Sequence, residues 1–127
     1  MKKTSFKIKI EDALFPVQAY FNSIPDEKFI IVLACFFNEI GSGFEETSIA
    51  FPSESEPWEK QFEGVEFGIS DKEIIISNKD FIKYLRQVCN VYEKDYTASQ
   101  KEVEALFNKI QKKFYYNYFY KGDCGGK

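Results

Sequence analysis

The feature that most constrains the fold is a change of hydrophobic period along the chain. Between residues 45 and 77, the stretches 45–51 and 65–69 alternate apolar and polar side chains, which is the period of a strand buried on one face. The segments on either side instead repeat their apolar residues every three or four positions, as amphipathic helices do. We therefore predict an α+β fold, a three-stranded antiparallel sheet covered by helices from the N- and C-terminal parts.

The three predicted strands form a meander. The first covers residues 45–51 and ends at Pro52, because proline cannot donate a hydrogen bond to a neighbouring strand. The second and third cover 65–69 and 73–77, and a tight turn at 70–72 joins them as a hairpin. The alternation assigns four side chains to the buried face of the sheet: Ile49, Phe51, Val65 and Phe67.

Two helices are predicted before the sheet. The first covers residues 13–23, and the second covers 26–40 and is closed by Gly41, a residue that readily takes the left-handed conformation of a helix C-terminus. Residues 29–37 are almost wholly apolar and β-branched in part, so a buried central strand is the alternative there. The glycine-rich segment 41–43 reads as a break before the first strand.

Two further helices are predicted after the sheet. Ser77 or Asn78 caps a helix that runs to about residue 94. Ser99 and Glu102 have the spacing of a capping box for the last helix, which continues into the aromatic run 115–120. We expect that aromatic end to pack on the sheet.

The size and the cysteines indicate one domain in a reducing compartment. A chain of 127 residues with 44% hydrophobic content can build a single core, which we assign to residues 1–121, followed by a flexible tail at 122–127. Cys35 and Cys89 lie in apolar patterns, Cys124 lies in the tail, and no C-x-x-C pair occurs. The N-terminus lacks the pattern of a signal peptide, so we expect a cytoplasmic protein.

The formal net charge of -3 hides a strong segregation along the chain. Residues 39–73 hold ten acidic and two basic side chains, whereas residues 79–127 hold ten basic and six acidic ones. Phosphate groups are bound by clustered Lys and Arg, so the acidic segment is not expected to bind nucleic acid directly. A basic partner is favoured instead, although acidic loops that only maintain solubility are the alternative.

The segment 44–67 combines this acidity with aromatic residues and is the predicted contact surface. Protein interfaces concentrate binding energy in a few aromatic anchors surrounded by polar residues. The alternative is that Phe51, Trp58 and Phe62 fold inward and fix the loop onto the sheet. The predicted contact residues are Glu45, Glu46, Glu54, Glu56, Trp58, Glu59 and Glu63.

No catalytic, cofactor-binding or metal site is predicted. The chain has no histidine, which removes the commonest general base and metal ligand, and it has no glycine-rich phosphate-binding motif. Glu54 with Glu59 or Glu63 is the obvious candidate for the acid and base pair of a glycosidase, but any chain this rich in glutamate offers such pairs by chance. We therefore expect a binding protein and not an enzyme.

One run of residues points to a family. The segment FFNEIGSGFEETSIAFPSESEPWEKQFEGVEFGISDKEIIISNKDFIKYLRQVCNVYE, at 36–93, resembles immunity proteins of bacterial contact-dependent growth inhibition (CDI) systems, in particular those cognate to ribonuclease toxins. The resemblance implies a protein that binds and neutralises the C-terminal nuclease domain of a CDI effector, a basic protein, through the predicted contact residues. The alternative hypothesis is an acidic mimic of nucleic acid that regulates a nucleic-acid-binding protein.

Overall fold

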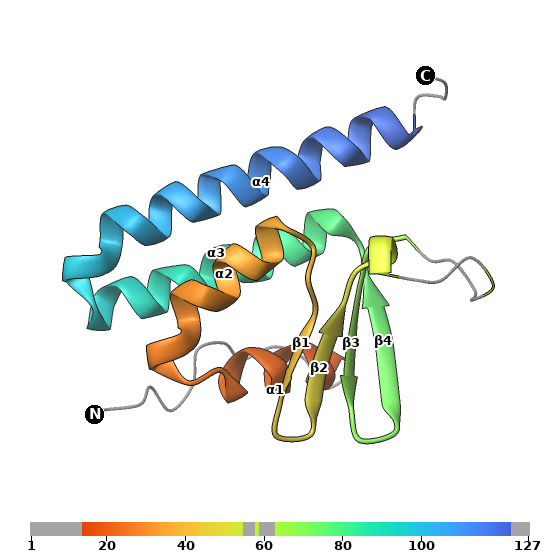
Figure 1. Ribbon diagram of the computed structural model, residues 1–127, viewed down its shortest axis with the longest axis horizontal. Helices are drawn as coiled ribbons and strands as arrows, with labels where there is room; N and C mark the ends of the chain where they lie inside the picture. Colours follow the sequence, from red (N-terminus) through yellow and green to blue (C-terminus); the bar gives the residue numbers. More distant parts are fainter. Residues whose placement is uncertain (1–13, 55–57, 59–62, 123–127) are drawn as a thin grey trace.

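The computed structural model describes residues 14–54, 58 and 63–122, without the side chains of 54 and 115–122. Helices and an antiparallel sheet follow one another in the order expected for an α+β fold (Figure 1). The main elements are α1 (Phe15–Ser23), α2 (Phe29–Phe37), β1 (Ser42–Phe44), β2 (Thr47–Ala50), β3 (Val65–Ile69), β4 (Lys72–Ile76), α3 (Asn78–Asp95) and α4 (Gln100–Gly122). Three short 3-10 turns accompany them: η2 (Asp26–Lys28), η3 (Pro52–Glu54) and η4 (Thr97–Ser99).

The sheet has four strands, so the prediction of three strands is wrong. The strand order is β1-β2-β3-β4, and all neighbours are antiparallel. The missed strand, β1, lies in the glycine-rich segment that we interpreted as a break. A two-residue turn, Glu45 and Glu46, joins β1 to β2 where we had predicted strand. Glu45 has a φ of 57°, a left-handed conformation that Gly, Asn or Asp usually adopts. Because a glutamate occupies this position, the sequence gives no signal for a hairpin turn.

The second helix is shorter than predicted, and the alternative of a central strand is wrong. The predicted span 26–40 divides into the turn η2 and the helix α2, which ends at Phe37. Glu39, and not Gly41, takes the left-handed conformation after the helix, with a φ of 56°. The chain reverses there because the N–H of Ile40 donates to the carbonyl of Cys35 at 2.9 Å.

The C-terminal helices agree well with the sequence pattern. Ser77 caps α3 as predicted, since its Oγ accepts a hydrogen bond from the N–H of Asp80 at 3.0 Å. The last helix, α4, continues to Gly122, which is the first residue of the predicted tail. None of the helices in the described ranges is both long enough and apolar enough to span a membrane.

The core lies between the sheet and the helices. Helix α1 packs across the inner face of the sheet, and α4 lies against α2 and α3 on the far side (Figure 1). Aromatic rings join the layers: the ring centroid of Tyr20 lies 5.8 Å from that of Phe67, and that of Phe36 lies 5.5 Å from that of Phe81. The four side chains predicted for the inner face are buried, which confirms the strand periodicity: Ile49, Phe51, Val65 and Phe67. Of the two cysteines that lie in apolar patterns, Cys89 is buried and Cys35 is partly buried.

Candidate functional site

The face of the sheet opposite α1 is open to solvent and is built from the acidic segment. Side chains alternate across a strand, so residues between the buried positions must point to this outer face. Two cross-strand rows form it, which we call the open sheet face: Ser48–Gly68–Glu73 and Ala50–Glu66–Ile75. Ser48, Glu73 and Ile75 are exposed, Ala50 and Glu66 are partly buried, and Gly68 is buried. Such a surface can receive a partner without rearrangement of the backbone.

Two carboxyl groups lie side by side on the open sheet face. Glu66 in β3 and Glu73 in β4 occupy adjacent rows of the same face. Partial burial raises the pKa of the Glu66 carboxyl, and the charge of Glu73 and a hydrogen bond with it raise that pKa further. Within the described ranges, no Lys or Arg forms an ion pair with either carboxyl. A cation supplied by a partner would therefore relieve the repulsion between them.

The turns at one end of the sheet carry Glu45 and Glu46. Both side chains are exposed. Ser70, in the turn between β3 and β4, donates its hydroxyl to Glu46 Oε1 at 2.7 Å and its backbone N–H to the Glu46 carbonyl at 3.1 Å. These bonds hold the two hairpin turns against each other, so the carboxylates occupy a fixed end of the sheet.

The loop at the other end of the sheet carries Trp58. Its side chain is 80% exposed, so the alternative in which Trp58 folds inward is wrong, whereas Phe51 is fully buried. Glu63 is exposed, and Glu54 ends the turn η3. The remaining residues of the predicted surface lie outside the described residues: Glu56, Glu59 and Phe62.

The predicted contact residues therefore lie at two ends of the sheet and not in one loop. Glu45 and Glu46 precede β2, whereas Trp58 and Glu63 follow it. At about 3.3 Å per residue, the four residues of β2 separate the two groups by roughly 13 Å. Only the open sheet face connects them. We call the whole the acidic sheet surface, made of the open sheet face with Glu45, Glu46, Trp58 and Glu63.

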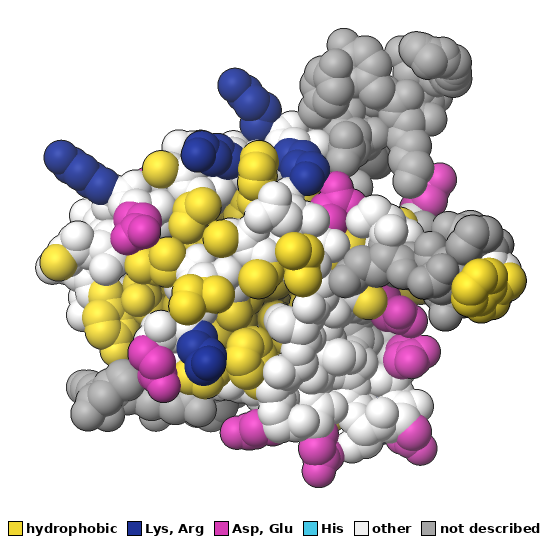
Figure 2. Space-filling view, in the orientation of Figure 1, with side chains coloured by type: hydrophobic (Ala, Val, Ile, Leu, Met, Phe, Trp, Pro, Cys, Tyr) yellow, Lys and Arg dark blue, Asp and Glu magenta, His cyan; other side chains and the backbone are white. Residues whose placement is uncertain are grey.

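Charge is segregated in space as well as in sequence. Figure 2 shows Asp and Glu side chains along the sheet end of the molecule, whereas most Lys and Arg side chains lie over the helices. Sequence reasoning had missed Glu66 and Glu73 as members of this surface. The alternation of Glu66 with Val65 and Phe67 was a signal for its outward direction, but its neighbour Glu73 follows only from the register of β3 and β4.

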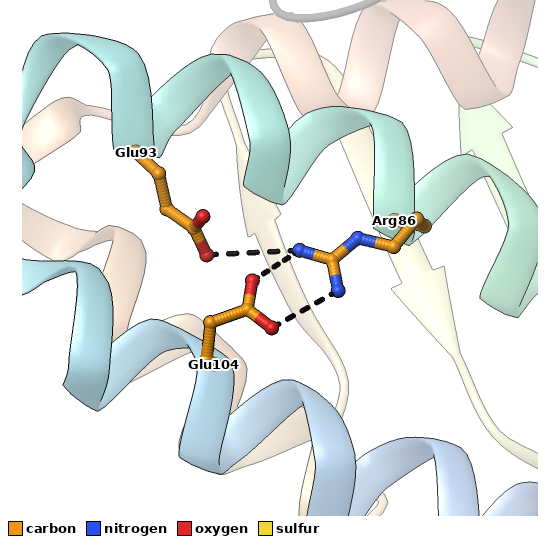
Figure 3. Close-up of polar contacts among 3 residues, drawn as sticks. All are labelled: Arg86, Glu93 and Glu104. Atoms are coloured by element: carbon orange, nitrogen blue, oxygen red, sulfur yellow. Dashed lines mark hydrogen bonds and ion pairs between the residues drawn. The ribbon is translucent and has the colours of Figure 1, made fainter.

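A second cluster of charged groups joins α3 to α4 (Figure 3). Arg86 donates Nη1 to Glu104 Oε1 at 3.2 Å and Nη2 to Glu104 Oε2. Its Nη2 also lies 3.6 Å from Glu93 Oε2. The guanidinium carbon is 4.2 Å from the ring centroid of Phe107, so the cation is also stacked on an aromatic face.

The cluster holds two carboxyl groups on one cation, and they titrate differently. Burial, and after it the hydrogen bond with Glu104 and the charge of Glu104, raises the pKa of Glu93 to about 7. Hydrogen bonds from Arg86 and Glu93 lower the pKa of Glu104. A raised carboxyl pKa can mark a catalytic acid. Here the contacts of the group come from α3 and α4, so we interpret the cluster as a connection between helices.

Comparison with known proteins adds an independent finding. A family model described as CDI immunity protein matches residues 10–107, which include α1 to α3, the whole sheet and the first turns of α4. A search of curated proteins finds no match.

Proposed function

Because the chain belongs to the CDI immunity protein family, and therefore neutralises a cognate CDI toxin, we propose that this toxin is a nuclease that cleaves RNA. The protein binds the C-terminal nuclease domain of the CDI effector in the cytosol of the producing cell. The contact is made by the acidic sheet surface together with Glu54, Glu56 and Glu59. Family membership favours this function over a general regulator of nucleic-acid-binding proteins.

One observation carries the proposal: the acidic part of the chain forms the open face and the ends of the sheet. Residues 39–73 supply ten carboxylates and two lysines, and all four strands lie within this range except the last three residues of β4. A domain that cleaves RNA must attract phosphates, and clustered Lys and Arg provide that attraction. The acidic sheet surface has the opposite charge, as a binding partner of such a domain requires.

Trp58 and the glutamates have different tasks in this interface. A tryptophan that is 80% exposed in the free protein gains the most from burial by a partner, so Trp58 is the anchor. The carboxylates around it steer the basic toxin during encounter and fix its orientation. Occupation of the cationic surface of the toxin excludes the RNA backbone, so inhibition needs no reaction by the immunity protein.

The test uses the toxin domain encoded beside this gene. The purified domain should cleave RNA, and one equivalent of the immunity protein should stop the cleavage. A domain with no activity on any nucleic acid would contradict the proposed toxin class, even if the two proteins bind each other.

Variants separate the roles of charge and anchor. Reversal of Glu56 and Glu59 to lysine should slow association and make the rate less dependent on salt, because long-range attraction between exposed charges is screened. Trp58→Ala should instead speed dissociation. Unchanged affinity and unchanged salt dependence in the charge-reversed variant would show that the acidic segment does not contact the toxin.

A further inference from the structure

A groove opens beside the acidic sheet surface, between α1 and the turn that joins β1 to β2. Its volume of about 420 Å³ falls within the range of roughly 300–1,000 Å³ that is typical of ligand pockets. Residues from α1 spaced three or four apart form one wall, and the hairpin forms the other. The lining includes Phe15, Gln18, Asn22, Glu45, Glu46 and Ile69.

The charge of the groove is one-sided. Glu45 and Glu46 are exposed carboxylates, and the described residues that line the groove include no Lys or Arg. Within the described part of the chain, neither carboxylate forms an ion pair with a basic side chain. Lys72 lies opposite Ile69 in the β3–β4 register, but it is not among the residues that line the groove. Among the described residues, the groove therefore presents two negative charges that no basic side chain offsets.

The rest of the lining suits a long cationic side chain. Ile69 is half-buried and provides an apolar contact for a methylene chain, as the stems of Arg and Lys prefer. Phe15 is 46% exposed and offers an aromatic face, on which a guanidinium stacks favourably. The hydroxyl of Ser70 holds Glu46 through Oε1, so this carboxylate is fixed before a partner arrives.

We infer that this groove receives an arginine or lysine side chain of the toxin domain. The inference rests on the proposed function only in that the toxin surface must be basic. The groove gives the hairpin end of the acidic sheet surface a specific contact, whereas the open sheet face supplies general attraction. Loss of the groove contact should therefore act on dissociation, and loss of charge on the open sheet face should act on association.

The experiment compares two groove variants with a matched control, using the toxin domain encoded beside this gene. Glu45→Gln with Glu46→Gln removes two charges from the groove, and glutamine at position 46 can still accept the hydrogen bond from Ser70. Ala19→Leu narrows the groove without any change of charge, because Ala19 also lines it. The control, Glu63→Gln with Glu73→Gln, removes two charges outside the groove. Thermal unfolding establishes that each variant is folded.

Both groove variants should raise Kd at least tenfold, mainly through faster dissociation. The control should slow association and leave the dissociation rate within about twofold. Groove variants that dissociate as slowly as the wild type would overturn the inference. If such variants still inhibit RNA cleavage, the proposed function stands and only the groove contact fails. If the toxin is not a nuclease but the groove variants lose affinity, the groove contact stands and the proposed toxin class fails. If Ala19→Leu does not fold, the double glutamine variant decides.

Discussion

Replacement of Glu93 by glutamine should stabilise the protein at pH 8 and leave its stability almost unchanged near pH 5. Glu93 is only 8% exposed and shares Arg86 with Glu104 between α3 and α4. Glu93 Oε2 and Arg86 Nε are buried without a hydrogen-bond partner, so the ionised carboxylate is poorly satisfied. Glutamine resembles the protonated form of glutamate and removes the charge.

The direction of this change in stability follows from the raised pKa of Glu93. The carboxyl of Glu93 has a pKa of about 7 in the folded protein, against an ordinary value of 4.5. Above pH 7 the folded protein must hold Glu93 ionised, which destabilises it. As the pH falls from 7 towards 4.5, the folded state binds this proton before the unfolded state does, and the penalty disappears. The wild type should therefore gain stability from this group on acidification, while the variant does not.

The magnitude follows from the same two values. A rise in the pKa of Glu93 from 4.5 to about 7 corresponds to about 3 kcal/mol of unfolding free energy when solvent does not screen the charges. The side chains of Arg86 and Glu104 are 32% and 36% exposed, so solvent screens the cluster and about 1 to 2 kcal/mol is the better expectation.

Urea unfolding followed by far-UV circular dichroism at pH 8 and pH 5 measures the effect. Glu63→Gln is the control, because it removes one charge from an exposed position outside the helices and strands and should change stability by less than about 0.5 kcal/mol at either pH. A Glu93→Gln variant that is no more stable than the wild type at pH 8 would refute the reasoning. So would a difference that is equally large at pH 5.

Two substitutions at backbone positions give further tests. Gly64 has a φ of +103°, and a Cβ there would lie 2.1 Å from the carbonyl oxygen of Ile76, so Gly64→Ala should destabilise the protein by more than about 2 kcal/mol in the same urea assay. At Gly68 the nearest atom to an added Cβ is Ser48 Oγ at 3.0 Å, so Gly68→Ala should lose clearly less stability; equal losses would contradict the close approach at Gly64. Glu45→Gly should relieve the left-handed backbone and stabilise the fold by about 0.5 to 1 kcal/mol while it weakens toxin binding. A loss of both stability and affinity would indicate that the turn needs the glutamate side chain to fold.

Elements with a long, regular pattern could be predicted from the sequence. The helix α3 has its cap at Ser77 and its apolar stripe on one face, and both are found. The hairpin of β3 and β4 follows from the alternation in β3 and the apolar run at 74–76, on the two sides of a polar turn. In these segments local preference and tertiary packing agree, so the pattern alone was sufficient.

The missed strand shows where tertiary contacts decide. The sequence of β1, Ser42–Phe44, has no strand preference of its own. It is held by its pairing with β2 and by a hydrogen bond of 2.7 Å between the hydroxyls of Ser42 and Tyr20. Neither contact is visible in the local pattern, and the Glu45-Glu46 turn lacks the residues that normally mark a hairpin.

The candidate site was predicted in composition but not in arrangement. The exposure of Trp58 and the acidity of the segment agree with the sequence. That the glutamates divide between two ends of a sheet depends on the position of the β1–β2 turn, which was missed. The groove depends on α1, a helix that was expected only to cover the core.

The central claim is that a basic toxin domain binds the acidic sheet surface, and the association rate at two salt concentrations tests it most directly. The association rate of the toxin domain encoded beside this gene should fall steeply between about 50 and 200 mM salt. Over this range the Debye length decreases from above about 10 Å to below it, so the attraction between the two proteins is screened. Glu66→Gln with Glu73→Gln should reduce the rate at low salt, whereas Lys109→Gln with Lys112→Gln, on the exposed face of α4, should not. Equal association rates for both double variants, or a wild-type association rate that does not change with salt concentration, would contradict the account.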